Sequence, residues 1–137
     1  MASTLNPYIS FRDNARQALE FYQSVFGGEL SLNTFADFGA QDEPHADNIM
    51  HGNLATDSGY TIMAADTPPG MDFSEGSNIT VSLSGDDGDR LRGYWEQLSG
   101  DGTVTVPLEK QMWGDEFGMC TDKFGIAWMV NISQPQA

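Results

Sequence analysis

The chain has 137 residues, a length that suits one compact domain with a core of its own. Hydrophobic residues make up 39% of it, including eight Phe, four Tyr and three Trp, so it is too apolar to remain disordered. Six Lys and Arg against twenty Asp and Glu give a net charge of −14, which repels nucleic-acid phosphates and anionic lipid surfaces. Neither nucleic acid nor membrane is therefore an expected partner.

The first half of the chain opens with an extended segment, residues 7–11, followed by a helix over residues 14–26. Asn14 and Gln17 are spaced as in a capping box, and Gly27 with Gly28 supplies the left-handed residues that commonly end a helix. The apolar residues that fall on one helical face are Ala15, Ala18, Leu19, Tyr22, Val25 and Phe26.

Three strands are expected after this helix, in residues 29–38, 48–56 and 60–66. The turn formers Asp57, Ser58 and Gly59 favour a hairpin between the last two. The first half of the chain therefore predicts a βαβββ unit.

The same order of elements follows residues 67–76, a segment rich in Pro and Gly that we interpret as a linker. The elements expected in the second half are a strand at 78–83, with Ile79, Val81 and Leu83 buried, a helix at 86–100, and strands at 103–108, 117–121 and 126–132. The turn "TDSG" at residues 56–59 returns as "TDKFG" at 121–125, where we expect Asp122 to act as a turn residue.

This duplication predicts a single α+β domain built from two tandem βαβββ modules, residues 1–66 and 77–134, joined by the linker 67–76. One helix cannot cover both faces of a four-stranded sheet. The second face of each sheet must therefore meet the other module, a partner chain or a ligand.

Cys120 is the only cysteine, which excludes an intramolecular disulfide, and without a basic neighbour in sequence it is expected to be structural. The start "MASTLNPYISF" lacks the basic residues and apolar core of a secretion signal. A cytoplasmic location is expected.

Two βαβββ modules, the segment "NARQALEFYQSVFGGEL" at residues 14–30, "WGDEFG" at 113–118 and "TDKFGIAWMVNI" at 121–132 together resemble the PhnB-like branch of the vicinal oxygen chelate superfamily, which includes glyoxalase I, bleomycin-resistance proteins and extradiol dioxygenases. The resemblance covers nearly the whole chain and implies curved mixed sheets around a cleft, often completed by a homodimer. Several members of this branch carry a demethylubiquinone methyltransferase label. Nothing in the sequence resembles a methyl-donor nucleotide site, because no glycine-rich turn leads from a parallel strand into a helix.

In metal-dependent relatives, four cleft residues bind a divalent ion. The resemblance places their counterparts at Pro7 or Tyr8, then at Met63, Asn78 and Met129. Proline has no donor atom, thioethers are poor ligands for zinc, nickel or iron, and an asparagine alone is weak. We therefore expect no metal and no cofactor, and a cleft lined by Tyr8, His51, Met63, Asn78, Trp113 and Met129. Trp113 would form an aromatic wall of this cleft, or it would fill the core instead.

Other polar residues are weaker candidates for chemistry. His51 shares a strand face with Asn53 and could act as an acid, a base or one arm of an atypical metal site, or could make one structural hydrogen bond. His45 and the acids Asp115 and Glu116 lie in polar loops, where solvated side chains are the simplest interpretation.

The leading hypothesis is a metal-independent, homodimeric protein that binds a small organic molecule in a cleft between the modules. The alternative is a glyoxalase-like lyase or isomerase, or a dioxygenase, that uses His51 with a nearby carboxylate, with or without an atypical metal. A third hypothesis is an interaction subunit with no small ligand. The sequence leaves open whether there is turnover.

Overall fold

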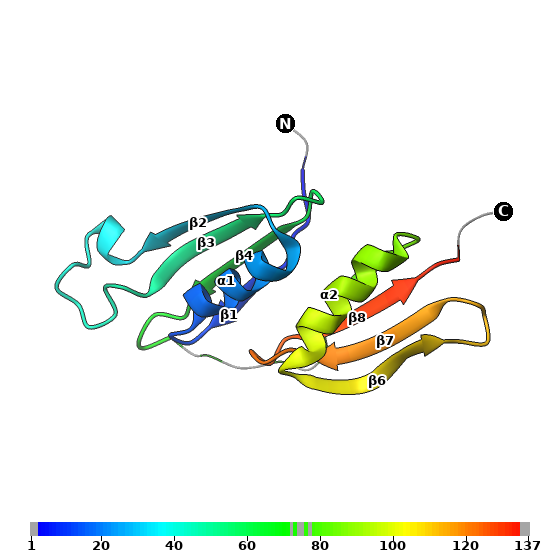
Figure 1. The fold of residues 1–137 in the computed structure, drawn as a ribbon. Coiled ribbons are helices and arrows are strands. Elements are labelled where there is room, and N and C mark those ends of the chain that lie inside the picture. The colour runs from blue at the N-terminus through cyan, green and yellow to red at the C-terminus, as the bar shows by residue number, and fades with distance from the viewer. Residues whose placement is uncertain (1–2, 72, 74–75, 77, 135–137) are drawn as a thin grey trace. The chain divides into compact units, whose positions relative to one another are not determined.

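Each half of the chain folds into a four-stranded sheet with one helix in a computed structural model, which describes residues 3–71, 73, 76 and 78–134 (Figure 1). The chain divides into two compact units, residues 1–75 and 76–137. Residues 72, 74 and 75 of the predicted linker, and residue 77 at the predicted start of the second module, lie outside the described residues. The described linker residues up to position 73 belong to the first unit.

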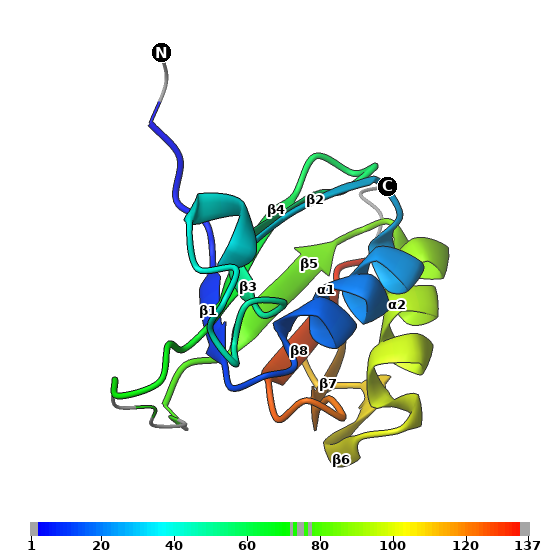
Figure 2. The same cartoon turned by 90° about the vertical axis from the view of Figure 1, so that its left-hand side faces the viewer.

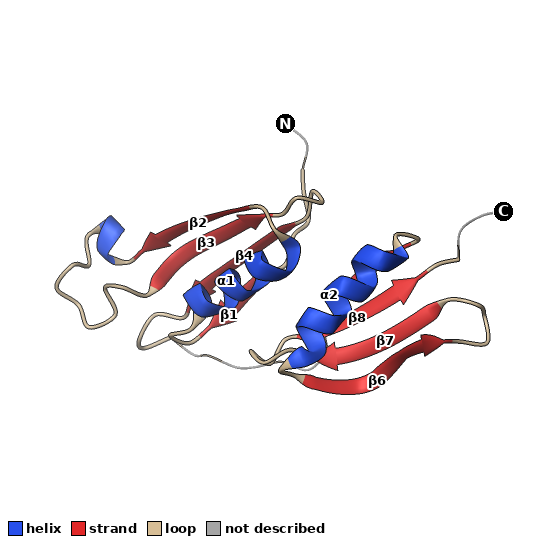
Figure 3. Ribbon diagram, in the orientation of Figure 1, coloured by secondary structure: helices blue, strands red, loops and turns tan. Residues whose placement is uncertain are grey.

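The predicted α+β class and the βαβββ order of each half are confirmed (Figure 3). The first unit contains β1 (Tyr8–Phe11), α1 (Ala15–Phe26), β2 (Glu29–Thr34), the 3-10 helix η1 (Ala36–Phe38), β3 (Ile49–Ala55) and β4 (Thr61–Asp66). The second contains β5 (Val81–Gly85), α2 (Gly88–Gly100), β6 (Thr103–Lys110), β7 (Glu116–Thr121) and β8 (Ala127–Ile132). None of the helices built from described residues is long and apolar enough to span a membrane.

The two sheets share one topology. Their strand orders are β1-β4-β3-β2 and β5-β8-β7-β6. In each sheet the first strand pairs in parallel with the last strand of its unit, and every other pair is antiparallel. Both sheets are therefore mixed, as predicted.

Each helix covers one face of its own sheet, as Figures 1 and 2 show for α2 beside β5–β8. All six residues predicted for the apolar face of α1 are buried, and α2 buries Leu91, Tyr94, Trp95 and Leu98. The strand residues that complete the two cores include Ile49, Leu54, Ile62, Ala64, Leu83, Cys120, Trp128, Val130 and Ile132. The opposite face of each sheet, which we call its open face, carries the alternate residues of the same strands.

A glycine in the middle of each sheet lets the helix approach closely. Gly52 on β3 lies under Leu19, and Gly118 on β7 lies under Trp95. A Cβ at Gly118 would be 2.9 Å from the Trp95 ring and 2.8 Å from the Cα of Leu108, which is closer than real Cβ contacts. The same packing solution in both units is what a duplicated βαβββ unit predicts.

The last hairpin of each unit is also built alike. The main-chain N–H of Thr56 donates to the carbonyl of Tyr60 at 2.9 Å, and that of Asp122 donates to the carbonyl of Ile126 at 2.9 Å. Asp122, at 3% exposure, also accepts N–H groups from Phe124 at 2.8 Å and from the Trp128 indole at 2.8 Å. Its predicted turn role is confirmed, and its structural counterpart is Thr56.

Three local predictions were wrong. Strand β5 begins at Val81 rather than at residue 78, and Ile79 is 80% exposed because it precedes the strand. Residues 36–38 form η1 instead of extending β2. The side chain of Asn14 makes no capping hydrogen bond, and the N–H of Ala15, the first helical residue, instead donates to the carboxylate of Asp66 at the end of β4.

Candidate functional site

The open face of the first sheet brings together three of the predicted site residues. Tyr8 on β1 pairs in register with Met63 on β4, and Met63 pairs with Asn53 on β3. His51 lies two residues before Asn53 on the same face, with its ring centroid 5.8 Å from that of Tyr8. The Tyr8 side chain is 51% exposed, so this part of the face is accessible within the unit.

A β-bulge turns Met50 toward this face. Asn33 on β2 pairs with His51, but the next residue, Thr34, pairs with Ile49, so Met50 is the extra residue of β3. Strict alternation would have put Met50 under α1 with Gly52. The bulge instead buries Ile49 completely in the core and turns Met50 to the other side.

Asp66, at the end of β4, connects the start of α1 to the start of β3 beside this face. Its Oδ1 accepts the N–H of Ala15, the first residue of α1, at 2.9 Å, and its Oδ2 accepts the N–H of Ile49 at 2.8 Å. The side chain is 3% exposed. One carboxylate therefore ties the start of the helix to the start of β3, and its charge complements the positive end of the helix dipole.

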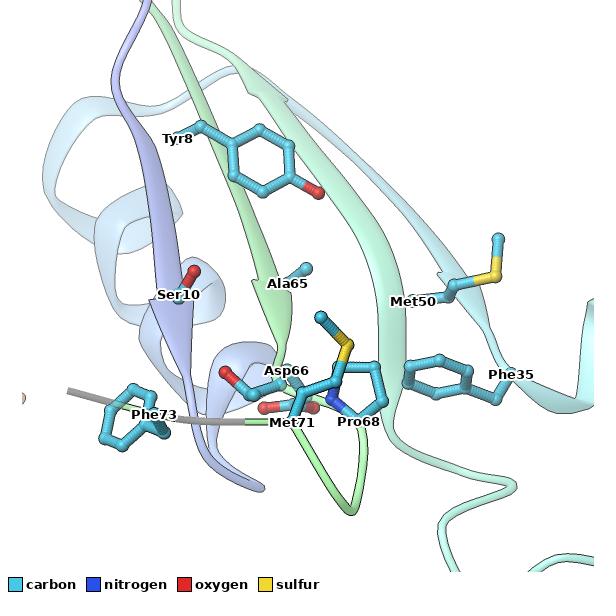
Figure 4. A pocket seen from close by; sticks show the side chains of 10 residues that line it. Tyr8, Ser10, Phe35, Met50, Ala65, Asp66, Pro68, Met71 and Phe73 are labelled. Carbon is cyan, nitrogen blue, oxygen red and sulfur yellow. The ribbon is translucent and has the colours of Figure 1, made fainter.

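These elements enclose a hollow of about 590 Å³ in the first unit (Figure 4). It is lined by Tyr8, Ser10, Phe35, Met50, Ala65, Asp66, Thr67, Pro68, Met71 and Phe73. In Figure 4 the rings of Tyr8 and Phe35 enter from different sides, and Asp66 lies low between them. The lining combines aromatic rings and thioethers with few polar groups, which is the usual character of a small-molecule site.

The segment after β4 closes one side of the hollow, and Arg12 holds it there. Arg12 Nη2 donates to the carbonyl of Met71 at 3.1 Å, and the guanidinium lies 5.3 Å from the centre of the Phe73 ring. The N–H of Thr67 also donates to the carbonyl of Phe11 at 2.7 Å. Part of the stretch interpreted as a linker is thus the wall of a pocket.

Sequence reasoning identified Tyr8 but missed the rest of this lining. Met71 and Phe73 stand two residues apart within a polar, Pro-rich stretch, and such a spacing of large apolar residues is the signal that could have found them. Phe35 gave no signal, because it reads as the continuation of a strand. His45, expected to be solvated, is half buried with its ring 4.9 Å from that of Phe35.

The remaining predicted site residues lie in the second unit. Met129 on β8 pairs with Ser82 on β5 and with Met119 on β7, in the place that Met63 has in the first sheet. Asn78 is exposed and precedes β5, and the register gives Ser82, not Asn78, as the counterpart of Tyr8. The expectation that Asn78 lies within the strand is therefore wrong.

Trp113 lies in the turn between β6 and β7, where Gly114 has φ of 102°. The indole is 62% exposed within the unit and its ring centroid lies 6.3 Å from that of Phe117, edge to face. Plain core filling, the alternative interpretation of Trp113, is wrong for this unit. Its predicted role as the wall of a ligand cleft stays a prediction.

The two acids beside Trp113 are engaged rather than simply solvated. Asp115 accepts the side-chain amide of Asn131 at 3.1 Å. Glu116 forms a two-point salt bridge with Arg92 of α2, in which Arg92 Nε lies 3.3 Å from Oε1. The hydrogen bond and the charge of Arg92 lower the pKa of Glu116, with a smaller effect from Lys110.

Cys120 is buried on the helix side of the second sheet. Desolvation raises the pKa of its thiol to about 11, with a further contribution from the charge of Asp122. The thiolate is the reactive form of cysteine. The geometry thus supports the structural role expected for Cys120.

At the positions to which the resemblance assigns metal ligands, each unit by itself offers side chains that are poor donors for a divalent ion. Tyr8 and Met63 in the first unit, and Ser82 and Met129 in the second, offer a phenol, a hydroxyl and two thioethers. Hard and borderline cations prefer carboxylate oxygen or imidazole nitrogen. Among the described residues, no three His, Cys, Asp or Glu side chains are grouped as metal ligands.

Comparison with known proteins places this geometry in a family. The family model described as 3-demethylubiquinone-9 3-methyltransferase matches residues 3–131. Protein YjdN from Escherichia coli (strain K12) is 28% identical over 144 residues, covering 96% of this chain and 97% of that protein. Protein PA1353 from Pseudomonas aeruginosa, known from its crystal structure, is 32% identical over 98% of this chain and 100% of that chain, with a TM-score of 0.86.

A glyoxylase/bleomycin resistance protein/dioxygenase domain from Frankia sp. EAN1pec covers 98% of this chain and 99% of its own, with 13% identity and a TM-score of 0.66. That likeness shows the fold, and the resemblance to the PhnB-like branch is confirmed by the family match. The chain therefore belongs to the family described as 3-demethylubiquinone-9 3-methyltransferase, within the vicinal oxygen chelate fold.

Proposed function

We propose that this protein binds a small organic molecule without a metal ion, in the hollow of the first unit. The observation that carries the proposal is the hollow of about 590 Å³ built from aromatic rings and thioethers. Sites for small molecules commonly enclose about 300–1,000 Å³ and combine apolar walls with a few polar groups. Here Ser10, Asp66 and Thr67 are the polar groups. The cleft expected between the two modules stays a prediction.

Filling the hollow tests the proposal. Ala65→Phe adds a ring to the open face of β4 inside the hollow, whereas Ser31→Phe adds the same ring to the open face of β2, at a residue that does not line it. A fragment screen by two-dimensional NMR should give ligands that shift the amides of Ser10 and Ala65. Such ligands should lose binding in Ala65→Phe and keep it in Ser31→Phe. Equal losses in both variants would contradict this location.

The absence of a metal requirement is a separate part of the proposal. Its support is the chemistry of the side chains at the family's ligand positions, where Met63 and Met129 offer only thioether sulfur. Elemental analysis of protein purified without chelators should find no transition metal near one equivalent. A stoichiometric metal that is lost on replacing residues of the open faces would refute this part.

The name of the family describes a methyl transfer, which the proposal does not include. The turn from β1 into α1, residues 12–14, contains no glycine. The turn from β5 into α2 consists of Asp86 and Asp87, flanked by Gly85 at the end of the strand and Gly88 at the start of the helix. Two adjacent carboxylates disfavour a phosphate-bearing ligand at this helix start.

An enzyme remains the second candidate function, because the ring of His51 lies 5.8 Å from that of Tyr8, which lines the hollow. An imidazole can act as acid or base on a bound substrate. With a ligand from the screen, His51→Ala should leave affinity within about threefold if the protein only binds, whereas an enzyme would lose turnover by about 100-fold or more. The expected homodimer also stays a prediction, to be measured by light scattering on a sizing column.

A further inference from the structure

We infer that the hollow of the first unit selects organic cations, such as substituted ammonium groups, over neutral and anionic molecules of the same shape. The inference rests on the proposed function, since it names the class of ligand for the same site. Three features of the site carry it: the aromatic and sulfur lining, the charge of the lining residues, and the charge of the surrounding unit.

The rings of Tyr8 and Phe35 both line the hollow, and the face of an aromatic ring is electron-rich. They enter the hollow from different sides, and Met50, placed there by the bulge in β3, adds a polarisable thioether (Figure 4). A cation within about 6 Å of an aromatic ring is attracted by the ring quadrupole, and pairs of rings are the usual receptors for alkylated ammonium groups. A neutral isostere gains the apolar contact but not this attraction.

The charge around the hollow has one sign. Asp66 is the only charged side chain among the lining residues, and both of its oxygens are fixed by main-chain N–H groups. Asp66 alternates with Ala65 along β4, so its carboxylate lies on the helix side of the sheet, where it is 3% exposed and does not touch a ligand in the hollow. Its charge acts across the strand, and no Lys or Arg is among the described lining residues to neutralise it, so it disfavours an anion in the hollow and favours a cation.

Arg12 contacts two of the lining residues, and it is already engaged. Its guanidinium stacks over Phe73 and bonds to Met71, and it is not among the lining residues. In the sequence of residues 1–75, Arg12 and Arg16 are the only Lys or Arg residues, within a chain of net charge −14. The local field thus draws cations toward the unit and repels anions.

A matched trio of probes tests the inference. They are 4-(trimethylammonio)phenol, its neutral isostere 4-tert-butylphenol, and the anion 4-tert-butylbenzoate, each titrated by NMR into the full chain at low salt. The cation should bind about tenfold more tightly than the neutral probe, with the anion weakest, and its shifts should map to the lining residues. Tyr8→Leu and Phe35→Leu should each reduce the preference for the cation to about threefold or less while the neutral probe keeps its affinity.

Tyr60→Leu serves as the control, because Tyr60 is a partly exposed aromatic residue of the same unit that does not line the hollow. This variant should keep the full preference. If the neutral probe binds at the lining residues as tightly as the cation, the inference is overturned and the proposed function stands. If none of the three probes binds at the lining residues although the fragment screen finds ligands there, the inference fails and the proposed function stands. If the fragment screen also finds none there, both fail.

Discussion

Replacing Asp66 by Ala should destabilise the first unit more than any single surface change. The carboxylate accepts two main-chain N–H groups, at 2.9 Å from Ala15 and 2.8 Å from Ile49, and the side chain is 3% exposed. A hydrogen bond to a charged group contributes about 1.5–3 kcal/mol, and a buried N–H left unpaired costs about as much as the lost bond. We expect a loss of about 3–5 kcal/mol in the free energy of unfolding. In Asp66→Asn, the remaining oxygen can still accept one main-chain N–H, but the side-chain NH2 group faces the other N–H and cannot accept it. About half of that loss is therefore expected.

The assay must report on the first unit, because Trp95, Trp113 and Trp128 all lie in the second. Urea unfolding followed by far-ultraviolet circular dichroism, together with hydrogen exchange of amides in α1 and β3, meets this need. Asp37→Ala is the matched control, since Asp37 also accepts a main-chain N–H, from Thr34 at 2.9 Å, but at an exposed site. It should cost about 1 kcal/mol or less. If Asp66→Ala and Asp37→Ala differ by less than about 1 kcal/mol, the anchoring role derived for Asp66 is wrong.

The remaining predictions concern the second unit. Gly102→Ala should destabilise it by about 1–3 kcal/mol, because a Cβ would lie 2.9 Å from a main-chain carbon of the β7–β8 turn. Gly93→Ala, which meets open space within α2, should stabilise it by about 1 kcal/mol, and thermal unfolding of the two variants measures both changes. The Cys120 thiol, with a pKa of about 11 against 9.0 for the free group, should react about 100-fold more slowly with a thiol reagent at pH 8 in the folded than in the unfolded chain. Because the pKa is raised on folding, its contribution to stability is complete below pH 9.0 and is lost as the pH rises toward about 11, which denaturation midpoints across that window will detect. Arg92→Ala should let the pKa of Glu116 rise toward its usual value, a change that an NMR titration of the carboxyl carbon follows, and no rise would mean that the salt bridge does not form in solution.

Errors in the sequence-based predictions had a common physical origin. Asn14 has the residue type and spacing of a helix cap, but the side chain that bonds to the start of the helix is the carboxylate of Asp66, 52 residues later, which accepts the N–H of Ala15. Strict alternation along β3 would assign both Met50 and Ile49 to the wrong face of the sheet, because one bulge shifts the register at this point. The bulge arises from the pairing of β3 with β2 and not from either residue. Asn78 and Ile79 read as alternating strand residues, although the parallel pairing with β8 begins only at Val81.

The sequence by itself determined the order of elements, the two βαβββ units, the buried faces of both helices and the family. Hydrophobic periodicity and turn residues depend on neighbouring positions only, and both patterns occur in each half of the chain. It also determined the net charge of −14, from which we predict that nucleic acid is not a partner. Only the tertiary structure decided where the pocket lies. Its position depends on contacts between segments far apart in the chain, which form the wall at Met71 and Phe73, turn Met50 to the open face and bury Asp66. Such contacts produce no periodic pattern in the sequence, so they could not be predicted from it.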